Sequence, residues 1–298
     1  IECDLEWLTD TTEKWCRDRA IYLALMESIK IADGQDDKKN RDAIPTILSD
    51  ALSVSFNRNV GHDYLEDYEE RYELYNKKES RIQFDLEYFN KITKGGLPNK
   101  TLNIALAGTG VGKSLFMCHH ASAVLLEGKN VLYITLEMAE EKIAERIDAN
   151  LLNVNIQEIV DLPKPIFESK VTNLAKKTQG SLIIKALLNE LSLKKSFKPD
   201  IIFIDYLNIC ASSRYRAGSN VNSYSYIKAI AEELRGLAVE ANVPIFSATQ
   251  TTRSGFASSD VDLTDTSESF GLPATADLMF ALISTEELEG LGQIMVKQ

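Results

Sequence analysis

The chain has 298 residues, of which 44% are hydrophobic and 26% are charged, and its formal net charge is −11. These proportions are typical of a globular protein with a sizeable core, and they exclude disordered and collagen-like chains. No apolar run reaches the roughly 20 residues that a membrane-spanning helix needs. The chain begins at Ile1 with no basic, apolar leader, so the sequence predicts an intracellular protein of the cytoplasm.

The acidic charge is concentrated at the start of the chain. Residues 1–80 contain 19 acidic and 11 basic residues, whereas the remainder contains 25 and 22. Nonspecific binding of nucleic acid depends on neutralising phosphates, which a strongly acidic protein does poorly. The nearly neutral remainder can still carry a local basic surface. The four cysteines form no zinc-type pattern, so we expect reduced thiols at Cys3, Cys16, Cys118 and Cys210.

The first part of the chain is predicted to be helical. Apolar residues recur at helical spacing over residues 1–33 and 44–56, with a charged loop between them. A third, highly charged helix is predicted over 62–78, and it carries a stripe of four tyrosines. A solvated single helix does not need such a stripe, so we expect this helix to dock on another surface. The stripe consists of Tyr64, Tyr68, Tyr72 and Tyr75.

After residue 80 the pattern changes to apolar runs of strand length that alternate with longer amphipathic segments. This alternation predicts βαβ units, and therefore an α/β fold with a parallel sheet covered by helices on both faces. In such sheets, ligands bind at the carboxyl ends of the strands. The expected strands are 102–106, 131–136, 182–184, 201–204 and 243–248.

The first of these strands leads into a predicted phosphate-binding loop. Glycines in such a loop let backbone N–H groups surround a phosphate, while the following helix adds the positive end of its dipole. Lys113 is expected to neutralise phosphate oxygens, and Ser114 to bind Mg²⁺. The alternative is a glycine-rich turn with an incidental Lys-Ser pair. The loop reads Ala107, Gly108, Thr109, Gly110, Val111, Gly112, Lys113 and Ser114, with Ala at the usual first glycine.

Three further polar residues follow predicted strands. Asp205 ends an apolar run in the manner of a carboxylate that positions Mg²⁺. Glu137 ends another run and can orient an attacking water or accept its proton, although it can equally be a surface or capping residue. Gln250 carries a neutral amide that can bond a γ-phosphate, although it can equally be a polar strand end. The guanine-reading Asn-Lys-x-Asp motif is absent, so ATP is the expected nucleotide; a small-molecule kinase stays conceivable.

These motifs, in this order, resemble the RecA-fold ATPases of the DnaB-type hexameric replicative helicases. The resemblance covers about residues 83–298. The residues that carry it are Leu97-Pro98-Asn99-Lys100, the phosphate loop, Thr135-Leu136-Glu137-Met138, Ile204-Asp205-Tyr206-Leu207 and Ala248-Thr249-Gln250.

The resemblance implies a role for each motif. Lys113 and Ser114 would hold the phosphates and Mg²⁺, and Asp205 would support the metal. Glu137 would be the catalytic base, and Gln250 would sense the γ-phosphate. The family's arginine finger would lie in a basic segment after Gln298.

The resemblance also implies an organisation and a set of partners. Residues 1–60 would be part of a helical N-terminal collar, 61–82 a linker helix that docks on a neighbouring subunit, and 83–298 the RecA-like ATPase domain. The protein would form a homo-oligomeric ring, expected to be a hexamer, that moves 5′ to 3′ along single-stranded DNA. Primase, a helicase loader and other replisome proteins would be its partners.

DNA contacts in the family come from loops that face a central channel. Here these loops would be the segments after Asp205 and Gln250, and a later phosphate-contacting stretch. Grooves of this kind bind single strands without reading their sequence. The expected contact residues are Arg214, Arg216, Arg253, Ser267, Glu268, Phe270 and Gly271.

Two other functions remain open from the sequence. A RecA- or RadA-like recombinase would share the sheet and its motifs but would form open filaments. A non-motor scaffold would use ATP only for assembly, with negligible turnover.

Overall fold

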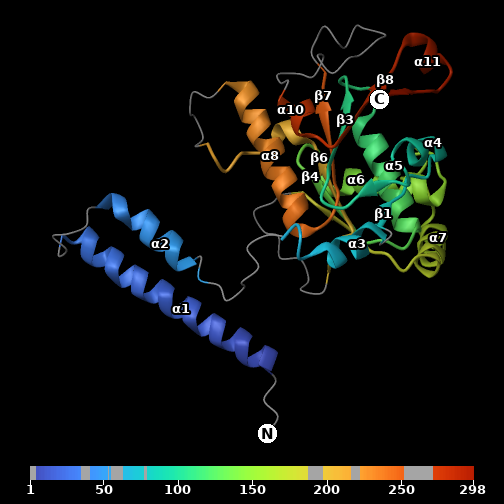
Figure 1. Ribbon diagram of the computed structural model, residues 1–298. Helices are drawn as coiled ribbons and strands as arrows, with labels where there is room; N and C mark the ends of the chain where they lie inside the picture. The colour runs from blue at the N-terminus through green and yellow to red at the C-terminus, as the bar shows by residue number, and fades with distance from the viewer. Residues whose placement is uncertain are drawn as a thin grey trace. The chain divides into compact units, whose positions relative to one another are not determined.

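A computed structural model describes residues 5–34, 41–52, 54, 63–76, 79–186, 197–215, 222–251 and 271–298. The chain divides into two compact units, residues 1–78 and residues 79–298. The first unit is helical, and the second contains the predicted sheet (Figure 1).

The first unit contains a helical hairpin and a separate short helix. Helix α1 spans Leu5–Ala32, and α2 spans Ile44–Leu52 and packs along it after a 3-10 turn at Arg41–Ala43. Small and branched apolar residues fill the contact, since Ala24, Ile31 and Ala51 are buried. Both helices agree with the sequence, although the second is described only to Leu52.

The third helix is shorter than its predicted span of 62–78. Helix α3 spans Tyr68–Asn76, after a turn in which the Asp63 carboxylate accepts hydrogen bonds from the Leu65 and Glu66 N–H groups at 2.9 Å. Every residue of α3 is at least partly exposed. The four striped tyrosines are between 59% and 78% exposed.

The second unit is built on a seven-stranded sheet in the order β5-β4-β6-β7-β3-β8-β9. All neighbouring pairs are parallel except β8 and β9, which confirms the predicted α/β class. Strand β8 and its apolar run were missed by the sequence prediction. The strands are β3 Leu102–Ala107, β4 Val131–Thr135, β5 Leu182–Lys185, β6 Ile201–Asp205, β7 Ile245–Gln250, β8 Leu278–Ile283 and β9 Met295–Lys297.

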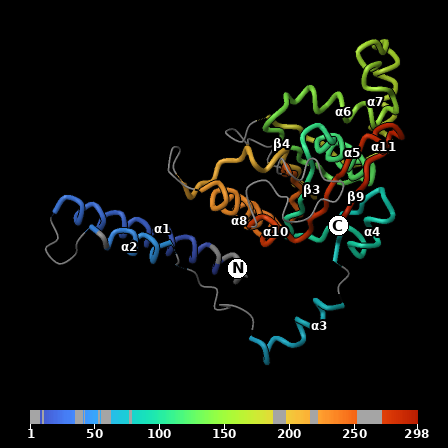
Figure 2. Tube along the Cα trace, turned by 90° about the horizontal axis from the view of Figure 1, so that it is seen from above, coloured from blue at the N-terminus to red at the C-terminus, as the bar shows by residue number. Residues whose placement is uncertain are grey.

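Helices cover both faces of this sheet, as Figures 1 and 2 show. Helices α5 (Lys113–Leu126) and α6 (Glu140–Leu152) bury apolar residues on one face. Helices α8 (Ser223–Ala241) and α10 (Gly271–Thr275) bury theirs on the other. The remaining elements are β1 Arg81–Ile82, α4 Glu87–Ile92, β2 Leu97–Pro98, α7 Lys164–Lys177, the 3-10 turn η3 Leu207–Ile209 and α11 Glu286–Gly290.

Buried polar side chains join the central strands to one another. The Asn103 amide on β3 donates to the Ile245 carbonyl on β7 at 3.1 Å. The Ser247 hydroxyl on β7 donates to the Ile204 carbonyl on β6 at 2.7 Å. At the opposite end from the phosphate loop, the Asp277 carboxylate accepts from the Leu102 N–H and from two guanidinium nitrogens of Arg235 on α8. These bonds satisfy groups that burial would otherwise penalise.

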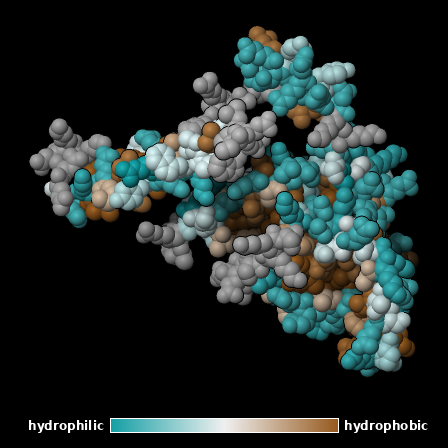
Figure 3. Space-filling model, turned by 90° about the horizontal axis from the view of Figure 1, so that it is seen from below, coloured by the Kyte–Doolittle hydropathy of each residue, from teal (hydrophilic) through white to brown (hydrophobic). Residues whose placement is uncertain are grey.

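The face shown in Figure 3 is largely hydrophilic, with apolar patches among the described residues. On the helical hairpin, the large apolar side chains Trp15, Leu23 and Ile29 of α1 are each more than half exposed. Within the described parts of the chain, no helix combines the length and the apolar character that crossing a membrane requires.

Candidate nucleotide-binding site

The predicted functional residues converge on one edge of the sheet. Strands β4, β6, β7 and β3 are consecutive neighbours and run in the same direction. Thr135 pairs with Asp205, and Ala107 pairs with Gln250. The carboxyl ends of these four strands therefore place Glu137, Asp205, Gln250 and the phosphate loop side by side.

The phosphate loop has the backbone shape that its glycines allow. Gly110 and Gly112 have φ angles of 83° and 110°, in the left-handed region that residues with a Cβ rarely adopt. Gly112 is also the residue before α5, so the helix begins at Lys113 with its first N–H groups facing the loop. An anion bound here would meet both these donors and the positive end of the helix dipole.

Lys113 lies inside the loop rather than in solvent. Its side chain is almost fully buried, and its ammonium group donates to the Gly108 carbonyl at 3.2 Å and to the Ala107 carbonyl at 3.4 Å. Burial lowers the pKa of Lys113, while the charges of Glu137 and Asp205 oppose that shift. The lysine therefore sits close to both carboxylates, which is where it would neutralise a triphosphate.

Asp205 presents one free oxygen. Its Oδ2 accepts a hydrogen bond from the Tyr133 hydroxyl at 2.9 Å, whereas its Oδ1 is buried and has no partner among the described residues. A buried carboxylate oxygen without a partner is costly unless a ligand completes it. Hard oxygen donors of this kind suit Mg²⁺, which usually keeps several waters and binds through one or two protein ligands. Ser114, half-buried in the first turn of α5, fits as the hydroxyl ligand.

Glu137 lies at the mouth of the site and is exposed. The preceding residue is fixed to β6, because the Leu136 N–H donates to the Asp205 carbonyl at 2.8 Å. The Thr135 hydroxyl closes the following turn by bonding both the carbonyl and the N–H of Met138. Glu137 is thus carried on a firmly held turn beside the buried carboxylate, with its own side chain open to water.

Tyr206 is a site residue to which the sequence analysis gave no role. Its hydroxyl accepts a hydrogen bond from the Gln250 amide at 3.1 Å, and its ring centroid lies 5.8 Å from the Lys113 ammonium nitrogen. Burial, together with the charges of Glu137 and Asp205, raises its pKa. The residue follows Asp205 directly, and that position was the available signal.

The predicted DNA segments are only partly described. Arg214 is paired with two carboxylates of α8, Glu232 and Glu233. Glu233 also accepts hydrogen bonds from Ser212 and Ser213, which fixes the base of the segment. Gly271 is the buried first residue of α10. The other expected contacts lie outside the described residues: Arg216, Arg253, Ser267, Glu268 and Phe270.

Comparison of the sequence with known proteins is consistent with this geometry. Residues 82–291 match the family described as DnaB-like helicase C terminal domain. The chain is 46% identical over 319 residues to a DnaB-like replicative helicase of Enterobacteria phage T4, covering 99% of this chain and 67% of the relative. It is 28% identical over 213 residues to a probable plasmid replicative DNA helicase of Chlamydia psittaci, covering 65% of this chain and 45% of that protein.

Solved structures share the fold. A DnaB-like replicative helicase, described with its interactions with primase, aligns with 94% of this chain and 70% of its own at a TM-score of 0.59. A second solved structure, described as an ATPase domain, aligns with 80% of this chain and 91% of its own at a TM-score of 0.62. Both are 18% identical to this chain, so the likeness is one of fold. On its sequence matches and its RecA-like sheet, the chain belongs to the DnaB-like helicase family.

Proposed function

We propose that this chain is the motor of a replicative DNA helicase that hydrolyses ATP and uses the energy to move along single-stranded DNA. The observation that carries the proposal is the convergence of the phosphate loop, two carboxylates and one amide at neighbouring strand ends. Phosphoryl transfer is catalysed mainly by positioning and by electrostatic stabilisation, which such a cluster supplies. The family to which the chain belongs supports the same reading.

Each residue has a separate task in this mechanism. Lys113 would leave the Ala107 and Gly108 carbonyls and bind phosphate oxygens. Mg²⁺, when bound with the nucleotide near Ser114 and Asp205, would supply positive charge that neutralises the β- and γ-oxygens. Glu137, held on its turn, would orient the attacking water and accept its proton. Gln250 would exchange its bond to the Tyr206 hydroxyl for one to the γ-phosphate, and so respond to hydrolysis.

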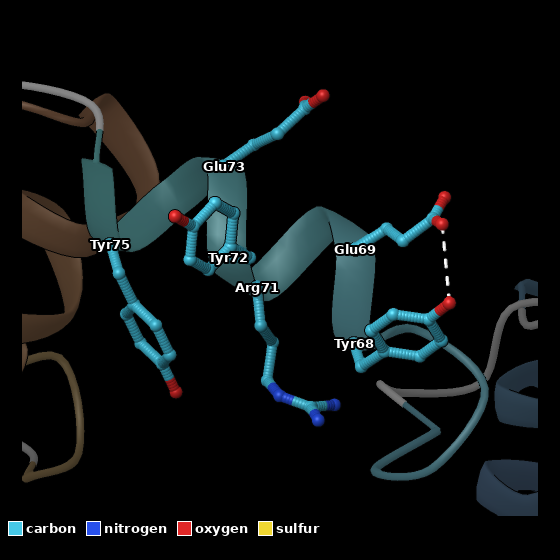
Figure 4. Close-up of a pocket in the computed structure, with 6 residues that line it drawn as sticks. All are labelled: Tyr68, Glu69, Arg71, Tyr72, Glu73 and Tyr75. Carbon is cyan, nitrogen blue, oxygen red and sulfur yellow. Dashed lines mark hydrogen bonds between the residues drawn. The ribbon is translucent and has the colours of Figure 1, made fainter.

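Assembly into a ring is the next part of the proposal. Helix α3 carries a groove of about 470 Å³ along its side, lined by Tyr68, Glu69, Arg71, Tyr72, Glu73 and Tyr75. Figure 4 shows the aromatic rings projecting from the helix, with the Tyr68 hydroxyl donating to Glu69 at 3.2 Å. Tyrosine and arginine are enriched at the centres of protein interfaces, and the surrounding rims are polar. We assign this face to a neighbouring copy, with residues 61–82 as linker and 1–60 as collar.

The remaining assignments rest on the family. The protein would form a hexamer in the cytoplasm, which would be that of the host cell if a phage encodes the protein, and it would move 5′ to 3′. Single-stranded DNA would be held by the segments after β6 and β7, including Arg214, Arg216 and Arg253, and by the stretch from Ser267 to Gly271. Primase, a loader and other replisome proteins would bind the assembled ring.

Substitution of Lys113 tests the proposal. In the complete protein, Lys113→Ala should lower ATP turnover and strand separation by at least about 100-fold, the loss typical of one preorganised charge in such a site. Lys164→Ala is the matched control, because Lys164 is an exposed lysine at the start of α7. Strand separation by Lys113→Ala at the rate of the control would refute the motor assignment. Open filaments in electron micrographs, in place of closed rings, would favour the recombinase.

A further inference from the structure

Tyr133 is an unusual residue for its position. It occupies the centre of β4, in a run of five fully buried residues that is otherwise apolar until Thr135. Its side chain has no exposed surface. Burying a phenol hydroxyl is unfavourable unless it finds a partner, and an apolar ring would fill the same space without that penalty. Packing alone therefore does not account for the hydroxyl of Tyr133.

The partner of the hydroxyl is the metal-site carboxylate. Tyr133 donates to Asp205 Oδ2 at 2.9 Å, from the strand next to β6. The ring is held in place by Phe203, whose plane is inclined by 14° at a centroid distance of 5.8 Å. The Cys118 thiol of α5 lies 3.8 Å from the same hydroxyl. Neighbours on both sides therefore leave the phenol little freedom to rotate.

Because of this contact, the two carboxylate oxygens of Asp205 have different surroundings. Oδ2 is occupied by the phenol, while Oδ1 is buried with no partner among the described residues. A carboxylate without such a bond can rotate about its terminal torsion, because that torsion is broad. With Oδ2 fixed, only Oδ1 is available to a metal or to a water of its coordination shell.

We propose that Tyr133 is a positioning residue that orients Asp205 so that its Oδ1 meets Mg²⁺ in the nucleotide complex. The inference rests on the proposed ATP-hydrolysing function and adds a residue to that site. Mutation of a side chain that hydrogen-bonds a metal ligand commonly lowers metal affinity by 10- to 100-fold. Tyr133 acts through Asp205 and touches neither nucleotide nor metal.

The test replaces Tyr133 with phenylalanine in the complete protein, which removes only the hydroxyl. Binding of a fluorescent ADP analogue is measured across a series of Mg²⁺ concentrations, and Mn²⁺ binding is followed by electron paramagnetic resonance. We expect the half-saturating metal concentration to rise about tenfold, the lower end of the range for such partners. The affinity for nucleotide without metal should be unchanged, because the phosphate loop is untouched. Tyr224→Phe on α8 is the matched control.

Several outcomes would overturn the proposal. A Tyr133→Phe variant with the metal requirement of wild type would do so, and so would an equal loss of nucleotide affinity with and without metal. Wild-type protein that binds nucleotide with no metal dependence would instead overturn the proposed function itself.

Wild-type protein provides a readout that does not depend on the folding of a variant. The protein is labelled at the tyrosine ring carbon that bears the hydroxyl oxygen, and exchange of each hydroxyl proton with solvent is followed. The proton of the Tyr133 hydroxyl should exchange slowly while Mg²⁺ and ADP are bound. Rapid exchange of every tyrosine hydroxyl would also overturn the proposal.

Discussion

His120 is the most isolated polar side chain in the described core. Its ring stacks on Phe84 with centroids 4.2 Å apart, and both ring nitrogens are buried without a described partner. Burial, with a smaller effect of His119, lowers the pKa of His120 to about 3. An unfolded histidine has a pKa of about 6.5. As pH falls below about 6.5, the unfolded chain therefore binds a proton that the folded chain refuses, and the fold loses stability down to about pH 3.

Replacing His120 with phenylalanine should remove this pH-dependent loss. We expect His120→Phe to be at least as stable as wild type at pH 7, because unpaired buried donors and acceptors are replaced by an apolar ring. Its advantage should be larger at pH 5, where the unfolded wild-type histidine is protonated. Urea denaturation at the two pH values, followed by circular dichroism, measures the difference. An equal stability difference at both pH values would contradict the assignment of a neutral buried histidine.

Helix α8 places two carboxylates beside the start of the segment after β6. Glu232 accepts a hydrogen bond from Arg214 and lies 3.8 Å from the Lys228 ammonium nitrogen, so one carboxylate restrains two cations. The hydrogen bond to Arg214 is the main reason why the pKa of Glu232 is lowered. Arg214 is exposed and Glu232 is partly exposed, and ion pairs at the surface are weak enough for a phosphate to displace them.

Neutralising Glu232 should therefore strengthen DNA binding. Glu232→Gln removes the closer of the two carboxylates beside Arg214, with Glu233 remaining, and removes the ion pair with Lys228. Affinity for single-stranded DNA should therefore rise about two- to fivefold at low salt and depend more steeply on salt. Fluorescence anisotropy with a labelled oligonucleotide measures both quantities. Glu240→Gln, an exposed glutamate near the end of the same helix, controls for net charge. Equal gains in the two variants would mean that Arg214 is not specifically restrained by Glu232.

Assembly of the proposed ring should depend on the aromatic face of α3. Tyr72 and Tyr75 are 69% and 78% exposed, so replacing them should leave the fold of one copy intact. In the complete protein, Tyr72→Ser with Tyr75→Ser should weaken ring formation at least tenfold, because interface tyrosines commonly dominate binding. Analytical ultracentrifugation across protein concentrations measures this effect. Tyr88→Ser, which changes a 72% exposed tyrosine of α4, should assemble as wild type does.

The fold could be predicted wherever its signal was local. Five strands were located to within two residues, because each is an apolar run bounded by turns. Strand β8 was missed although Leu278–Ile283 is apolar throughout. Helix α3 was predicted to begin too early, because the run of charged residues and tyrosines already starts in the turn at Asp63 that precedes the helix.

The site, too, could be predicted only where its residues are adjacent in the sequence or follow a general rule. Its phosphate loop is contiguous, and the strand ends bring in Asp205, Glu137 and Gln250 by a general rule of parallel sheets. The contacts of Tyr133 with Asp205 and of Gln250 with Tyr206 join residues 72 and 44 positions apart. Their existence depends on strand order and register, which the sequence alone does not specify.

The bonds between buried side chains and neighbouring strands have a consequence for how the chain selects its topology. Apolar strands are nearly interchangeable in hydrophobicity, so burial alone hardly distinguishes one arrangement from another. Three buried polar side chains instead specify which strands are neighbours. Asn103 links β3 to β7, Ser247 links β7 to β6, and Tyr133 links β4 to β6. A swapped or slipped strand would bury an unmatched polar group at a cost of about 1–3 kcal/mol. The sheet that brings the candidate site residues together thus discriminates against its own misfolded alternatives.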